Sequence, residues 1–172
     1  MIDYPRPLLG FAAFSGTGKT TLLKRLIPLL GEKGLRIGLI KHAHHDVEFD
    51  TPGKDSYELR KAGASPVLLS SGRRWALMAE RETPCDPLLQ EEVWRVDPKD
   101  VDLLLVEGFR HEAFPKIELH RRVLDRPLLF PGDPHIIAVA ADGPLPVTTN
   151  LPLLDLDAPD RIAGYILEHI MA

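Results

Sequence analysis

Runs of apolar residues bounded by turn-forming residues are the clearest pattern along this chain. Such runs, rich in β-branched or small side chains, cover residues 7–14, 36–41, 66–70, 101–107 and 135–140. Because they are apolar at consecutive positions, they are typical of parallel strands buried on both faces. Between them, helices are predicted over residues 19–33, 55–62, 87–93 and 159–170. This alternation of strands and helices predicts an α/β fold.

Two segments depart from the alternation. VLLSSGRRWALM (67–78) and PKIELHRR (115–122) resemble shorter strands that turn back on their neighbours, and Ser71-Gly72 supplies a turn in the first of them. We therefore expect a mostly parallel sheet with helices on both faces and an antiparallel extended hairpin. The intervening Pro- and Gly-rich loops are too short to be linkers between domains, so a single domain over residues 1–172 is expected.

Charge and cysteine content narrow the classes of function. The 21 Lys and Arg residues against 25 Asp and Glu give a net charge of −4, which provides no bulk attraction to nucleic acid or to anionic lipid. We find no signal peptide and no apolar run long enough to span a bilayer. The single cysteine, Cys85, cannot form an internal disulfide and favours a reducing compartment. A cytoplasmic protein with no nucleic-acid or membrane partner is therefore expected.

The strongest chemical motif lies between the first strand and the first helix. The loop at residues 13–21 matches the Walker A phosphate-binding pattern, except that Ala13 replaces the first glycine of that pattern. Glycines let successive backbone N–H groups surround an anion, and the helix N-terminus adds positive potential. This predicts a three-layer P-loop NTPase fold whose phosphate-binding residues are Ser15, Gly16, Thr17, Gly18, Lys19, Thr20 and Thr21.

Three side chains are candidates for contacting the phosphates or their metal ion, two from this loop and one from a later strand. Lys19 should reach the β- and γ-phosphates, and the hydroxyl of Thr20 should bind Mg²⁺. Glu107 ends the apolar run VDLLLVE, and strand ends of this kind gather ligands in open α/β sheets. We therefore predict Lys19, Thr20 and Glu107 as catalytic residues, with Thr20 and Glu107 at the metal. The simpler alternative is that Glu107 only ends a strand at the surface.

A polar loop follows the second predicted strand. It should border the phosphate loop, because it leaves a strand expected to neighbour the first one. Its side chains suggest either substrate binding or a metal site. The candidate residues are His42, His44, His45 and Asp46, followed by Lys54, Asp55 and Ser56. Arg73 and Arg74, at the hairpin turn, are either binding residues or a solvated edge.

Taken together, these motifs resemble the bacterial MobB family of molybdopterin-guanine dinucleotide biosynthesis proteins. The resemblance spans nearly the whole chain: AAFSGTGKTTLLKRLIPLL, GLIKHAHHD, DTPGKDSYELRKAGA, SSGRRWALMAE, DLLLVEGFRHE and PKIELHR. The family also resembles this chain in having alanine at the position of Ala13. The resemblance implies a GTP-binding protein with Mg²⁺ and weak GTPase activity, forming a homodimer.

The resemblance further implies a role in molybdenum cofactor biosynthesis beside the guanylyltransferase that makes the dinucleotide cofactor, among other molybdopterin-handling proteins. It places the loop 42–46, together with Lys54, Asp55, Ser56, Arg73 and Arg74, on a face for molybdopterin or the partner protein. The residues alone leave two alternatives open. One is a P-loop small-molecule kinase, in which Arg73 or Arg74 would belong to a lid, and the other is a nucleotide-bound scaffold without turnover.

Overall fold

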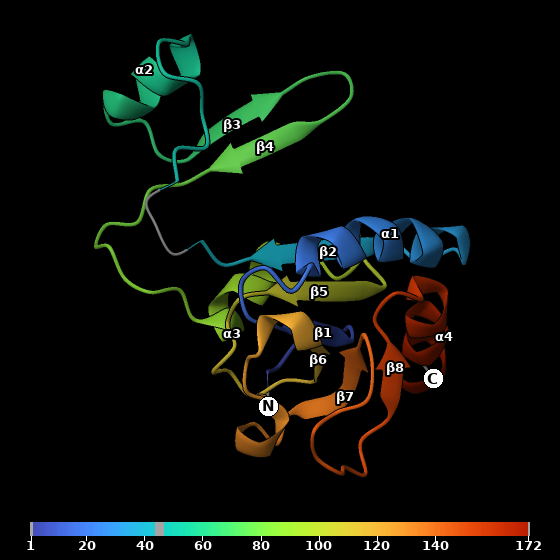
Figure 1. Cartoon of the computed structure of the whole chain (residues 1–172). Coiled ribbons are helices and arrows are strands. Elements are labelled where there is room, and N and C mark those ends of the chain that lie inside the picture. Colours follow the sequence, from blue (N-terminus) through green and yellow to red (C-terminus); the bar gives the residue numbers. More distant parts are fainter. Residues whose placement is uncertain (1, 44–46, 172) are drawn as a thin grey trace. The chain divides into compact units, whose positions relative to one another are not determined.

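The computed structural model describes residues 2–43 and 47–171, and the chain divides into two compact units. The first unit is formed by residues 1–42 and 87–172, and the second by residues 43–86. Figure 1 labels their helices and strands. The expectation of a single domain over the whole chain stays a prediction, and the two units are described one at a time.

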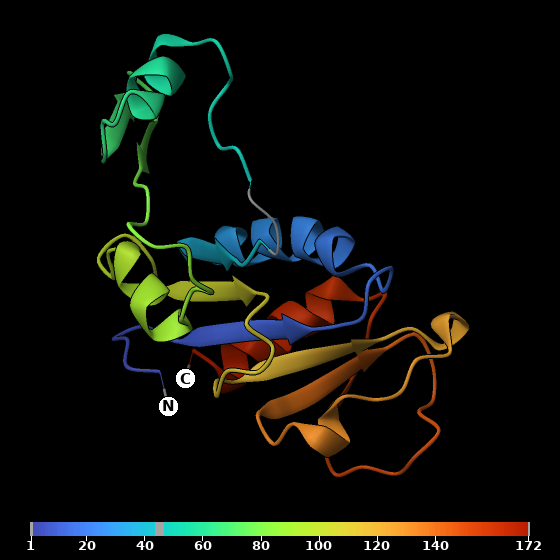
Figure 2. The same cartoon turned by 90° about the vertical axis from the view of Figure 1, so that its left-hand side faces the viewer.

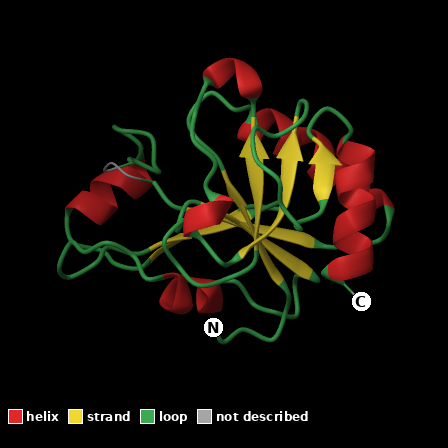
Figure 3. Cartoon of the chain, turned by 60° about the horizontal axis from the view of Figure 1, so that its bottom comes forward, coloured by secondary structure: helices red, strands yellow, loops and turns green. Residues whose placement is uncertain are grey.

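The first unit contains a six-stranded sheet in which every neighbouring pair of strands is parallel. The strands in spatial order are β2 (Ile37–Lys41), β5 (Leu103–Glu107), β1 (Leu8–Ala12), β6 (Lys116–His120), β7 (Ile136–Ala141) and β8 (Leu153–Asp155). Figure 3 shows the strands fanning out, the twist expected of such a sheet. The short strand β8 lies outside the predicted elements, because three residues carry too little pattern to be recognised.

Helices cover both faces of this sheet, so the predicted three-layer α/β fold is confirmed. On one face lie α1 (Lys19–Glu32) and α4 (Pro159–His169), which pack against each other. On the other lies α3 (Leu89–Glu92), which continues into a 3-10 turn at Val93–Arg95. Among the described residues, two further 3-10 turns lie at Arg122–Leu124 and Phe130–Gly132. Within residues 2–43 and 47–171, the structure has no helix long and apolar enough to cross a membrane.

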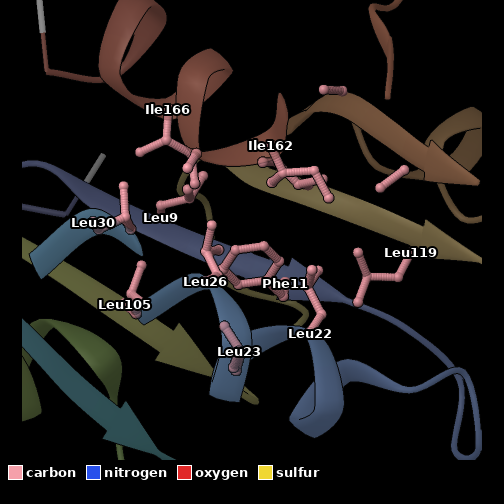
Figure 4. Close-up of a cluster of buried hydrophobic side chains, with 14 of the residues drawn as sticks. Leu9, Phe11, Leu22, Leu23, Leu26, Leu30, Leu105, Leu119, Ile162 and Ile166 are labelled. Atoms are coloured by element: carbon pink, nitrogen blue, oxygen red, sulfur yellow. The ribbon is translucent and has the colours of Figure 1, made fainter. Parts of the chain in front are cut away.

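The larger hydrophobic core lies between β1 and the two long helices. Leu9 and Phe11 of β1 face Leu26 of α1 and Ile162 of α4, as Figure 4 shows. The intervening Leu8 packs instead in a second core beneath α3. This alternation explains why all five residues of β1 are buried and why the strand is apolar at every position. A rigid strand therefore leads directly into the loop before α1.

The prediction that residues 115–122 turn back on their neighbours is wrong. Strand β6 is parallel and lies between β1 and β7, with all five residues buried. Its alternation of charged and apolar residues is typical of a half-exposed strand. Here, however, the charged side chains have partners within the protein. The Lys116 ammonium lies 2.8 Å from Asp133, and Glu118 accepts backbone N–H bonds from the segment at Leu129. Burial raises the pKa of the Glu118 carboxyl.

Strand β2 also differs from expectation, because it does not pair with β1. Strand β5 lies between them, with Lys41 beside Glu107 in register. Glu107 is consequently on a strand that does neighbour β1, as predicted. The insertion of β5 places the end of β2 one strand further from the loop after β1 than the sequence analysis assumed.

The second unit comprises α2 (Asp55–Lys61) and an antiparallel hairpin of β3 (Val67–Ser70) and β4 (Trp75–Met78). The predicted hairpin is confirmed, and its turn closes through the Ser71 N–H, which donates to the carbonyl of Arg74. The interpretation of residues 66–70 as a buried parallel strand is wrong, because Leu68 and Leu69 are exposed. Arg60 of α2 anchors this unit by ion pairs with Glu48 and Glu80.

Candidate functional site

The loop between β1 and α1 has the backbone of an anion cradle. Gly16 and Gly18 have φ angles of 84° and 97°, in the left-handed region that favours glycine. Gly18 is also the N-cap of α1 and makes no side-chain cap, so the first-turn N–H groups depend on other partners. The buried Thr17 closes the loop, since both its hydroxyl and its N–H donate to the carbonyl of Phe14.

Glu107 approaches the loop lysine from the end of β5. The Nζ atom of Lys19 lies 3.6 Å from Oε1 of Glu107, and Nζ of Lys41 lies 3.5 Å from Oε2. The Glu107 side chain is only 15% exposed. The structure therefore brings Lys19 and Glu107 together as predicted, and it adds Lys41. A carboxylate between two ammonium groups beside a glycine-rich cradle suits a centre that handles both an anion and a cation.

His42 belongs to the same end of the sheet. Its N–H donates to the carbonyl of Glu107 over 2.8 Å, and its ring stacks on Phe109 with 4.8 Å between centroids. Gly108 makes this contact feasible, because a Cβ built there would lie 2.5 Å from the Cβ of His42. His44, His45 and Asp46 lie outside the described residues. In the part of the chain that is described, no three His, Cys, Asp or Glu side chains form a group that could hold a metal.

Arg121 is the important residue that the sequence analysis missed. It follows β6 directly, and its Nε donates to the carbonyl of Thr17 over 3.1 Å. Its remaining nitrogens reach Asp142 at 3.5 Å and Asp157 at 3.3 Å. The signal was present as the pair Arg121-Arg122 after PKIELH. The mistaken direction of β6 placed that pair away from the phosphate loop.

The remaining candidates belong to the second unit. Lys54 is the N-cap of α2, and Asp55 and Ser56 are the first helical residues. Arg73 and Arg74 lie exposed in the turn between β3 and β4. Each of these positions is open at the surface or partly so, which leaves their predicted binding role as a prediction.

Comparison with known proteins identifies the family. The model of molybdopterin guanine dinucleotide synthesis protein B, MobB, matches residues 8–142. The chain belongs to the MobB family. The molybdopterin-guanine dinucleotide biosynthesis adapter protein of Escherichia coli K12 is 51% identical over 163 residues, covering 94% of this chain and 92% of the relative. The protein of the same name from Haemophilus influenzae Rd is 44% identical and covers 93% of this chain and 87% of that relative.

Solved MobB structures share the fold. The crystal structure of Bacillus subtilis MobB superposes with a TM-score of 0.71 at 25% identity, over 95% of this chain and 98% of that one. The MobB homologue from Bacillus stearothermophilus gives 0.69 at 22% identity, over 95% of this chain and 97% of its own. The likeness extends over nearly the whole of each chain, so the resemblance found in the sequence motifs is confirmed.

Proposed function

We propose that this MobB family member binds GTP with Mg²⁺ at residues 15–21 and acts as an adapter in molybdopterin-guanine dinucleotide biosynthesis. The observation that carries the proposal is the cradle around Gly16 and Gly18, with Lys19 held 3.6 Å from Glu107. The names of the two bacterial relatives support the pathway. The guanylyltransferase of that pathway and molybdopterin-handling proteins are the proposed partners.

The residues present fit a magnesium-bound triphosphate. A side chain at Gly16 or Gly18 would strain the left-handed backbone of the cradle, which accounts for glycine at both positions. Thr20, the second residue of α1, and Glu107 would hold the ion, either directly or through its waters. The ion would neutralise charge on the phosphates when bound. Lys19 supplies a fixed positive charge to the same oxygens.

The proposed GTPase activity is weak, because the chain offers few groups for activating water. Gln90 is the only glutamine in the sequence. It bonds to the backbone of Asp3, before the start of β1, whereas the phosphate loop follows the end of that strand. Arg121 is held by the carboxylates of Asp142 and Asp157. Neither side chain is therefore set to orient a nucleophile at the phosphates.

We also propose a homodimer formed through the hairpin of the second unit. Leu68 and Leu77 face each other across β3 and β4 and are 61% and 57% exposed. Trp75 on the same hairpin is 68% exposed. A two-stranded sheet is barely stable alone and has two open edges, so a second copy of the hairpin would cover both apolar side chains and backbone groups.

The second unit also carries the proposed face for molybdopterin or the partner protein. Lys54, Arg73 and Arg74 offer exposed cations there, and Asp55 and Ser56 begin α2 beside Lys54. His42 belongs to the first unit and is proposed as a binding residue there, while His44, His45 and Asp46, proposed for the same role, lie outside the described residues. Cys85 is an exposed free thiol, in keeping with the proposed cytoplasmic location.

Following the γ-phosphate of labelled GTP into its products distinguishes the proposed adapter, a weak GTPase, from a small-molecule kinase. The protein is incubated with Mg²⁺, labelled GTP and a molybdopterin-containing extract, and all phosphorylated products are separated. Slow release of inorganic phosphate alone supports the proposed activity. A phosphorylated small molecule would instead identify a kinase, and complete absence of turnover would identify a nucleotide-bound scaffold.

A further inference from the structure

Lys41 lies at the end of β2, and the proposed function leaves it without a role. Its Nζ atom is 3.5 Å from Oε2 of Glu107, while Nζ of Lys19 is 3.6 Å from Oε1 of the same carboxylate. In the described part of the chain, Glu107 is the only ion-pair partner of Lys41, whose side chain is 60% exposed. Because an exposed ion pair contributes little to stability, the Lys41 ammonium can exchange this partner for another at low cost.

The backbone of Lys41 is fixed beside Glu107. Strands β2 and β5 lie side by side (Figure 1), and Lys41 pairs with Glu107 in their register. The next residue, His42, donates its N–H to the carbonyl of Glu107. Gly108 permits this close approach, since a Cβ there would lie 2.5 Å from the Cβ of His42. The side chain of Lys41 can therefore change partner without any movement of the strand.

Lys41 and Glu107 also lie on the face of the sheet that α1 covers. Leu103 and Leu105, at alternate positions before Glu107, belong to the core that contains the buried side chains of α1. Ile37, four residues before Lys41, packs against the same core. Because side chains alternate between the two faces of a strand, both charged side chains lie on the face where the phosphate loop enters α1.

This position is suited to the terminal end of a bound phosphate chain. In P-loop proteins the magnesium ion bridges oxygens of the β- and γ-phosphates. Glu107 is proposed to hold that ion, so a cation beside Glu107 lies close to these two phosphates. Lys41 would lose its hold on the carboxylate once a doubly charged ion binds there. The γ-phosphate oxygens are then available to accept hydrogen bonds from its ammonium.

Arg121 is less suited to this role. It lies on the other side of the loop, because β5 and β6 flank β1. Its nitrogens are engaged by the carbonyl of Thr17 and by the carboxylates of Asp142 and Asp157. A terminal phosphate would compete with all of these contacts to bind Arg121, but only with Glu107 to bind Lys41.

We propose that Lys41 binds the γ-phosphate and makes the site prefer a nucleoside triphosphate to a diphosphate. Its ammonium balances the additional negative charge that the terminal phosphate brings. With a diphosphate, Lys41 keeps its pair with Glu107 and adds nothing to the affinity. This inference rests on the proposed binding of a nucleotide at the phosphate loop.

Calorimetric titration with a non-hydrolysable GTP analogue and with GDP, both in the presence of Mg²⁺, tests the inference. We expect the wild type to bind the analogue more tightly than GDP. Lys41→Met removes the ammonium and keeps an unbranched side chain. Its affinity for the analogue should fall by about 10-fold, as expected for loss of one charge-assisted hydrogen bond, while its GDP affinity should stay the same. Lys41→Arg keeps a cation and should restore the preference for the analogue.

Lys24→Met is the matched control, because Lys24 is an exposed lysine on α1 of the same unit. It should bind both nucleotides as the wild type does. Equal wild-type affinities for the two nucleotides would overturn the inference, as would an unchanged affinity ratio or an equal loss of both affinities in Lys41→Met. Lys19→Ala tests the phosphate site itself and should lose affinity for both nucleotides. If Lys19→Ala binds both as the wild type does, the proposed function fails, so the two failures are distinguishable.

Discussion

The ammonium of Lys19 lies 3.6 Å from the carboxylate of Glu107, which joins the start of α1 to the end of the neighbouring strand β5. Lys41 approaches the other carboxylate oxygen. Without a ligand, Glu107 pairs with Lys19. With a triphosphate, the same carboxylate would repel the phosphates unless a cation lay between them. Glu107 should therefore couple phosphate binding to Mg²⁺.

This coupling predicts the behaviour of Glu107→Gln. Calorimetric titration of GTP with and without Mg²⁺ should show that the ion strengthens binding to the wild type. In the variant that gain should shrink by roughly 10- to 100-fold, as found when a carboxylate near a metal is removed. An unchanged gain would mean that Glu107 only pairs with the two lysines.

The hairpin predicts the oligomeric state. Sedimentation should give about twice the chain mass of 19.2 kDa at micromolar concentration. Leu68→Glu should give monomers, because it places a charge in the proposed interface without disturbing a buried side chain. Val123→Glu is the control, since Val123 is 82% exposed in the first unit and should leave the dimer intact. A monomeric wild type, or a dimeric Leu68→Glu, would refute this interface.

Hydrolysis by the isolated protein should be slow. A P-loop GTPase without an arginine placed at the phosphates is expected to turn over on the order of 10⁻⁴ s⁻¹. Single-turnover assays should show acceleration when molybdopterin and the guanylyltransferase are added. A rate of about 1 to 100 s⁻¹ for the protein alone would contradict the adapter proposal.

Acid stability should depend on the pair of Arg36 and Asp102. Hydrogen bonds from the Arg36 side chain and backbone hold the pKa of the Asp102 carboxyl well below its usual range. Because the pKa of the Asp102 carboxyl is lower in the folded protein than in the unfolded one, the pair stabilises the folded protein above about pH 4, the ordinary aspartate pKa. This contribution is lost as the pH falls from there towards the folded pKa.

Asp102→Asn should therefore flatten the dependence of the free energy of unfolding on pH below about pH 4. Urea unfolding at several pH values measures this slope. Glu32→Gln, at an exposed position near the end of α1, should leave the slope as in the wild type. A slope in Asp102→Asn equal to that of the wild type would show that the pair contributes nothing on acidification.

The sequence predicted the parts of the molecule whose signal is local. Gly16, Gly18 and Lys19 follow an apolar strand and precede a helix, and each of these elements is found where expected. Glu107 was identifiable because a single carboxylate ends an apolar run. Such patterns depend only on neighbouring residues.

The sequence failed where burial is decided by distant residues. Lys116 and Glu118 look like solvent-facing positions until Asp133 and the backbone of Leu129 and Phe130 are brought to them. The resulting error in β6 concealed Arg121 as a neighbour of the phosphate loop. The position of β5 between β1 and β2 was likewise invisible, because strand order is set by crossovers and not by local pattern.

Calorimetric titration of GTP into wild type and Lys19→Ala, with Mg²⁺ present, tests the central proposal most directly. Lys24→Ala is the matched control, because Lys24 lies exposed on the same helix. Loss of one charged contact to phosphate should weaken binding by about 10- to 100-fold in Lys19→Ala, with unchanged circular dichroism and melting temperature. Lys24→Ala should bind as the wild type does. Equal affinity of Lys19→Ala and the wild type for GTP would contradict the assignment of residues 15–21 as the nucleotide site.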